Sequence, residues 1–168
     1  MKKMLLFVLV VTAALQICVP SYMIWDKYDT LRNGEEVRMR VEPFDPYDAF
    51  RGRYVSLNYD CEVDYLERED KRYGVLEIGA DGFATIKEVV EEKPEGTLYI
   101  TSKEENYFVM PLDRYYMEET MAPEAESMIS GQRDAYVTIR IKDDKALLSG
   151  LYVEDKPIEE LIKEEKQF

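Results

Sequence analysis

The longest apolar run of the chain lies near its start. Residues 4–25, MLLFVLVVTAALQICVPSYMIW, carry no formal charge, and at ~1.5 Å rise per residue a helix of this length spans the hydrocarbon core of a bilayer. Lys2 and Lys3 precede the run, while Tyr22 and Trp25 close it with rings that favour the membrane interface. The pattern predicts a membrane-spanning signal anchor at 4–25 that follows a short N-terminus at 1–3.

The charges that flank this segment predict its orientation. Positive residues before the span keep residues 1–3 cytoplasmic and place the rest of the chain outside the cytoplasm, as a single-pass protein of the cell membrane. A cleaved signal peptide is the alternative, because the core from Met4 to Leu15 also has the length of an h-region. The small-x-small pattern around residues 12–14 is weak, so we favour the uncleaved anchor, followed by a linker at 26–34.

Beyond residue 34 the apolar positions alternate with polar ones. Residues 37–41 and 54–59 both show this period, which is typical of half-buried strands. In the second segment Val55, Leu57 and Tyr59 share one face, so Tyr54 points to the opposite one. Between the two segments, Asp45-Pro46 resembles a helix start and Gly52 a helix stop, which predicts a helical turn over 46–51.

The remaining runs predict a mainly antiparallel domain. Two hairpins are expected, one with Asp81-Gly82 at its turn. The expected elements are strands at 73–78, 83–90, 97–102, 107–110, 135–141 and 146–153, and one helix at 118–129 interrupted by Pro123. Short strands with one or two short helices favour a mainly β fold (α+β at most), Greek-key or barrel-like, over residues 35–157. A charged C-terminal tail is expected at 158–168.

Composition excludes several classes of function. The chain has no histidine, which rules out a Ser-His-Asp triad and any His-ligated metal site. Its net charge of −13 repels phosphate backbones, so we expect no binding of nucleic acid. Of the two cysteines, Cys18 lies in the apolar segment and Cys61 in the domain. An intrachain disulfide is therefore not expected. We also expect no cofactor and no metal.

The block VEPFDPYDAFRGRYVSLNY at 41–59 resembles the signature of the bacterial GDYXXLXY-domain family, in which a DPxDxxRGDYVxLxY pattern leads into a strand. Two more segments look like that family. Residues 107–116 are similar to its second block, and LLSGLYVEDKPI is similar to its closing hairpin. The chain departs from the pattern at Arg53, where the family has Asp, and at Asp113, where Glu is usual.

The resemblance implies a protein with one N-terminal span and an extracytoplasmic domain. Genes of the family often lie beside those of multi-spanning membrane proteins, which implies a partner of that kind. We therefore favour a non-enzymatic accessory protein that acts through a polytopic membrane protein, and tyrosine and arginine are frequent in interface hot spots. The motif and candidate interaction residues are Asp45, Pro46, Asp48, Arg51, Gly52, Arg53, Tyr54, Leu57, Tyr59, Asp113, Arg114, Tyr115 and Tyr116.

Two other functions stay open at this point. A membrane-tethered hydrolase loosely similar to type I signal peptidases would use Ser21 near the membrane surface, although the residues after it do not match that family. A module that binds a cation or a small ligand would use an acidic run. That run comprises Glu62, Asp64, Glu67, Glu69 and Asp70. Because Arg68 and Lys71 interrupt it, a solvated surface explains it as well.

Overall fold

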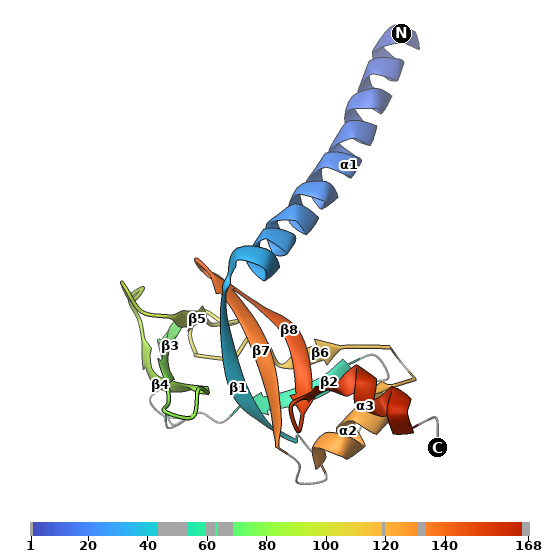
Figure 1. Cartoon of the computed structure of the whole chain (residues 1–168). Coiled ribbons are helices and arrows are strands. Elements are labelled where there is room, and N and C mark those ends of the chain that lie inside the picture. The colour runs from blue at the N-terminus through green and yellow to red at the C-terminus, as the bar shows by residue number, and fades with distance from the viewer. Residues whose placement is uncertain are drawn as a thin grey trace.

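A computed structural model describes residues 2–43, 54–59, 63, 69–118, 120–130 and 134–165 (Figure 1). The elements in chain order are α1 (Lys2–Asn33), β1 (Glu35–Pro43), β2 (Tyr54–Tyr59), β3 (Tyr73–Ile78), β4 (Ala84–Val90), β5 (Tyr99–Thr101), β6 (Arg114–Tyr116), α2 (Ala122–Ser130), β7 (Ala135–Lys142), β8 (Lys145–Val153), β9 (Lys156–Pro157) and α3 (Ile158–Glu165). The helical turn expected at 46–51 lies outside the described residues.

The strands form two antiparallel sheets, which confirms the mainly β prediction. One sheet has six strands in the order β6-β2-β1-β7-β8-β9 and curls into a half-barrel, while the other has three in the order β4-β3-β5. Arg38 of β1 forms an isolated parallel bridge with Phe83, next to β4, which ties the two sheets together. Apolar side chains of both sheets, including Met39, Ile86 and Phe108, form a single buried core.

Strand β2 has the bounds and the alternation that the sequence predicts. Val55, Leu57 and Tyr59 are buried, and Asn58 on the other face is exposed. The predicted hairpins are β3–β4 and β7–β8. At 107–110, where a strand was expected, the chain makes only an isolated bridge, between Tyr107 and Glu69.

Helix α1 does not end with the apolar run. Residues 26–33 of the expected linker belong to the same helix, because charged residues such as Asp26 are compatible with a helix and no glycine occurs before Gly34. The Gly34 N–H donates to the carbonyl oxygen of Thr30 over 2.9 Å. A Cβ at residue 34 would lie 2.5 Å from that oxygen and 3.0 Å from the carbonyl oxygen of Ile141, so this junction requires glycine.

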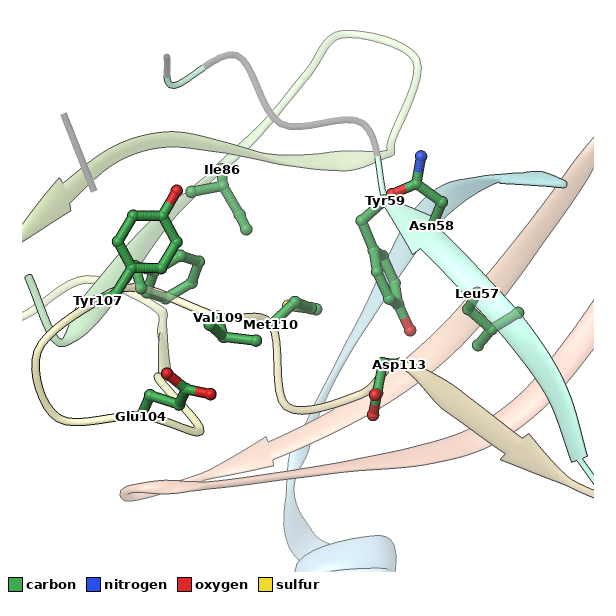
Figure 2. A pocket seen from close by; sticks show the side chains of 10 residues that line it. Leu57, Asn58, Tyr59, Ile86, Glu104, Tyr107, Val109, Met110 and Asp113 are labelled. Atoms are coloured by element: carbon green, nitrogen blue, oxygen red, sulfur yellow. The ribbon is translucent and has the colours of Figure 1, made fainter. Parts of the chain in front are cut away.

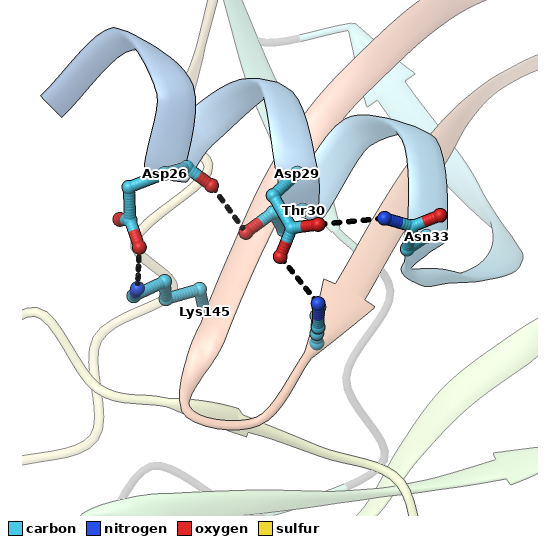
Figure 3. Close-up of polar contacts among 6 residues, drawn as sticks. Asp26, Asp29, Thr30, Asn33 and Lys145 are labelled. Atoms are coloured by element: carbon cyan, nitrogen blue, oxygen red, sulfur yellow. Dashed lines mark hydrogen bonds and ion pairs between the residues drawn. The ribbon is translucent and has the colours of Figure 1, made fainter. Parts of the chain in front are cut away.

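The last turns of α1 are fixed to the β7–β8 hairpin. The Lys145 ammonium donates to the Asp26 carboxylate over 2.5 Å, and Lys142 pairs in the same way with Asp29. Between these pairs the Thr30 side chain is 2% exposed and donates to the Asp26 carbonyl oxygen over 3.2 Å. Figure 3 shows these contacts along one side of the helix. The helix and the sheet are therefore joined directly.

The segment expected as a charged tail contains helix α3. Ile158 and Ile162 are fully buried, and four residues apart they lie on one face of the helix. This face packs against β8, β9 and α2. Helix α2 begins at Ala122, later than the expected 118, because Pro123 is tolerated only in a first helical turn. Both helices cover the half-barrel (Figure 1).

Candidate functional site

The two motif blocks of the chain form one pair of strands. β6 runs antiparallel to β2, with Tyr116 opposite Tyr54 and Arg114 opposite Ser56. Residues more than fifty positions apart in the sequence thus share one surface. The other candidate positions, from Asp45 to Arg53, lie outside the described residues. The site below is therefore built from β2, β6 and their neighbours.

One face of this strand pair belongs to the core. The Tyr59 hydroxyl donates to the Leu112 carbonyl oxygen over 2.6 Å, and burial, together with the nearby Asp113 carboxylate, raises the pKa of Tyr59. The Leu57 N–H donates to the Asp113 carbonyl oxygen over 3.0 Å. Leu57 and Tyr59 therefore hold the segment that leads into β6.

Tyr115 connects β6 with the opposite side of the half-barrel. Its hydroxyl donates to Glu159 of α3 over 2.6 Å. Burial and the bond to Glu159 raise the pKa of Tyr115. This side chain thus joins β6 to α3, a helix that itself packs against β8.

The other face of the pair carries Tyr54, Arg114 and Tyr116, which we call the outer trio. The Arg114 guanidinium carbon lies 4.8 Å from the centre of the Tyr54 ring, within cation–π range. The two tyrosine rings meet edge to face with centres 5.7 Å apart, and Tyr116 is 68% exposed. A hydrogen bond to Tyr116 raises the pKa of Arg114. The trio is an ordered aromatic and cationic patch that solvent reaches.

A first groove lies where the motif strands approach the three-stranded sheet (Figure 2). It encloses about 550 Å³. Two of its polar groups already have partners within the protein. The Asp113 carboxylate pairs with Lys103 over 3.3 Å, and the Tyr59 hydroxyl donates to the Leu112 carbonyl oxygen. The lining residues are Leu57, Asn58, Tyr59, Ile86, Glu104, Tyr107, Phe108, Val109, Met110 and Asp113.

A second groove, which we call the membrane-proximal groove, lies between β6 and β8. It encloses about 660 Å³, and Lys27 of α1 contributes to its rim, two residues after the end of the apolar run. The lining residues are Lys27, Lys103, Pro111, Leu112, Asp113, Arg114, Tyr115, Tyr116, Ala146, Leu147 and Leu148. Two of the outer trio, Arg114 and Tyr116, thus extend into this groove.

The structure also shows where the residues lie that a hydrolase or a cation-binding module would use. Ser21 lies within α1, where its hydroxyl donates to the Ile17 carbonyl oxygen over 2.8 Å, and Cys18 is an exposed free cysteine on the same helix. Glu69 and Asp70 are exposed, while the other three residues of the acidic run lie outside the described residues. Within the described ranges no group of three or more Cys, Asp or Glu side chains could hold a metal ion.

Sequence reasoning missed three parts of this site. Glu159 was assigned to a charged tail, although Ile158 and Ile162 signal a helix. Leu147 and Leu148 were assigned only to a strand of a hairpin, and nothing local indicates that they face β6. Lys27 had a usable signal, because it is among the first charged residues after the apolar run.

Comparisons with known proteins identify one family. The model of the GDYXXLXY protein family matches residues 16–151. This match covers the end of α1, both motif blocks and most of the β7–β8 hairpin. Comparisons with curated proteins and with solved structures give no match.

Proposed function

The chain belongs to the GDYXXLXY protein family, and from this premise we propose that it is a membrane-anchored, extracytoplasmic accessory protein that binds a polytopic membrane protein. The observation that carries the proposal is the direct junction between α1 and the β7–β8 hairpin. One helix, long and apolar enough to cross a membrane, continues into the domain without a flexible connection. The domain is thereby held against the membrane surface, where a membrane protein can reach it.

The outer trio supports a role in protein contact. Tyrosine and arginine are the residue types that carry most binding energy at interfaces, and a rigid patch loses little entropy when it binds. The trio needs no rearrangement, because Arg114 already stacks on Tyr54. Within the residues that the structure describes, Tyr116 is not part of the core and is 68% exposed.

The first test asks whether a partner exists. The full chain with its span is expressed in its own membranes, which are then solubilised gently, and the proteins that co-purify are identified. We expect one polytopic membrane protein, and we expect Arg114→Ala and Tyr116→Ala to lose most of it. Arg72→Ala is the matched control, because Arg72 is also exposed and ion-paired but lies beside the three-stranded sheet.

A second test addresses the orientation. A reporter enzyme that is active only outside the cytoplasm, fused after residue 168, is expected to be active in cells. The same reporter fused to a chain that lacks Lys2 and Lys3 is expected to lose part of this activity, because the positive flank sets the orientation. An inactive reporter on the intact chain would exclude an extracytoplasmic domain.

Recovery of the lone protein in the first test would exclude the accessory role.

A further inference from the structure

The half-barrel is open along one side, and the opening has two free strand edges. Among the described strands β6 is the last of the six-stranded sheet and pairs only with β2. On β8, the strand β9 pairs with Tyr152 and Val153. Among the described residues the first half of β8 therefore has no hydrogen-bonded strand opposite β7, although β5 and the end of α1 lie beside it. For the part of the chain that the structure describes, neither 114–116 nor 146–148 makes a backbone–backbone hydrogen bond outside its own ladder.

The membrane-proximal groove fills the space between these two edges. Tyr115 is one of its lining residues, and the Tyr115 hydroxyl is held by Glu159. Its open part is lined by Pro111 and the apolar side chains of 146–148, which are half-buried. Leu147 lines the groove and, within the described part of the chain, is not one of the residues that pack against the core, so a molecule in the groove can contact its side chain.

This groove differs in charge from the rest of the protein. The chain as a whole carries −13, yet the groove rim carries Lys27, Lys103 and Arg114 against a single acid, Asp113. Lys103 and Arg114 both pair with Asp113. Among the described residues Lys27 has no ion-pair partner, which leaves one unneutralised cation beside the membrane.

We infer that the membrane-proximal groove binds an extended segment of the membrane partner, which adds a strand between β6 and β8. The inference rests on the proposed function and names its contact site. Exposed strand edges bind extended peptides through main-chain hydrogen bonds, and the pockets beside them select alternate side chains. The segment adjoins a span of the partner, because Lys27 places the groove at the membrane surface. The partner's segment places apolar side chains against residues 146–148 and a carboxylate beside Lys27.

Site-specific crosslinking in native membranes tests the contact. Leu147 of the full chain is replaced by the photoreactive residue benzoylphenylalanine, and the crosslinked peptide is sequenced by mass spectrometry. The expected product is a stretch of a polytopic membrane protein next to one of its spans, and Lys27→Glu is expected to lower its yield at least tenfold. The matched control carries the same label at Ile78, a strand residue that is 53% exposed on the other sheet, and gives no such product.

Hydrogen exchange separates strand addition from simple surface contact. Backbone amides of 146–148 and 114–116 are expected to exchange more slowly in the purified complex than in the lone protein, whereas those of 77–78 are unchanged. Leu147→Glu is expected to abolish the complex without lowering the melting temperature. Lys27→Glu is the second variant, because Lys27 lies in α1, outside both sheets, and its replacement is expected to leave the domain folded.

Other results would overturn the inference. Crosslinks from residue 147 only to lipid or only to a second copy of this chain would do so, as would unchanged amide exchange in the complex. If the membrane protein still co-purifies with Leu147→Glu and Lys27→Glu, the groove is not the contact site, while the accessory role stands. If the wild-type chain retrieves no membrane protein at all, both the groove inference and the accessory role fall.

Discussion

The two faces of the β2–β6 pair use the same residue types for different purposes. On the inner face Tyr59 and Tyr115 place their hydroxyls on fixed acceptors, the Leu112 carbonyl and the Glu159 carboxylate. On the outer face Arg114 stacks on Tyr54, and the exposed Tyr116 ring meets Tyr54 edge to face. A motif rich in tyrosine is therefore not one functional unit. Its inner positions stabilise the fold, and its outer positions are exposed to a partner.

The strongest test of this division is a truncation on the inner face. Leu57→Ala is expected to lower the free energy of unfolding by about 2–5 kcal/mol, because Leu57 is 6% exposed within the core and its loss leaves a cavity. Urea denaturation followed by circular dichroism measures the change. Ser56→Ala, one residue away on the opposite face, is the control and should stay within about 0.5 kcal/mol of wild type. Equal effects would mean that the two faces do not differ.

A smaller loss is expected from removing one inner hydroxyl. Tyr59→Phe keeps the ring but leaves the Leu112 carbonyl oxygen without its donor, which costs about 1–3 kcal/mol for a buried acceptor. The measurement is again the urea midpoint. Tyr115→Phe is the companion variant, and its effect should be weaker because Tyr115 is only partly buried.

The inner tyrosines also predict how stability depends on pH. Their pKa values are raised in the folded protein, so above pH ~10 the unfolded chain releases these protons while the folded chain retains them. The two tyrosines therefore do not change the free energy of unfolding below that pH, and they lower it as the pH rises further. Urea midpoints between pH 8 and 11 measure the slope, and Tyr59→Phe should reduce it. An unchanged slope in Tyr59→Phe would contradict the assignment.

The smallest effect on stability belongs to the outer face. Tyr116→Ala is expected to change the free energy of unfolding by about 1 kcal/mol or less, because the ring is 68% exposed and loses an edge contact with Tyr54 and an exposed hydrogen bond to Arg114. The same variant should nevertheless lose the co-purified membrane protein. A large loss of stability together with retained binding would assign Tyr116 to the fold instead.

Local pattern predicts the strands of this protein well and their partners poorly. The alternation of 54–59 gives β2 with its buried face, and Asp81-Gly82 marks the β3–β4 turn. That β6 pairs with β2 depends on contacts between residues far apart in the sequence, which no local period encodes. The two motif blocks were candidates by resemblance, but their pairing, and the division into two faces that it creates, came from the structure.

The helical errors have a different cause. At the end of α1, charged residues were interpreted as a linker because they mark the return to water, but charge alone does not end a helix. In α3 the high content of Glu and Lys outweighed the spacing of Ile158 and Ile162. In both cases the composition of a segment was weighted above the positions of its few apolar or helix-ending residues.

Because α1 continues without interruption up to the sheet, its length fixes how the side chains of the apolar segment are rotated relative to the domain. Each residue turns a helix by about 100°, so Gln16, Pro20 and Met23 lie on the side of α1 that carries Lys27. One residue inserted before Asp26 would rotate this stripe by about 100° relative to the sheet, whereas seven would return it to within about 20°. The number of residues between span and sheet thus encodes which side of the span faces a neighbour in the bilayer.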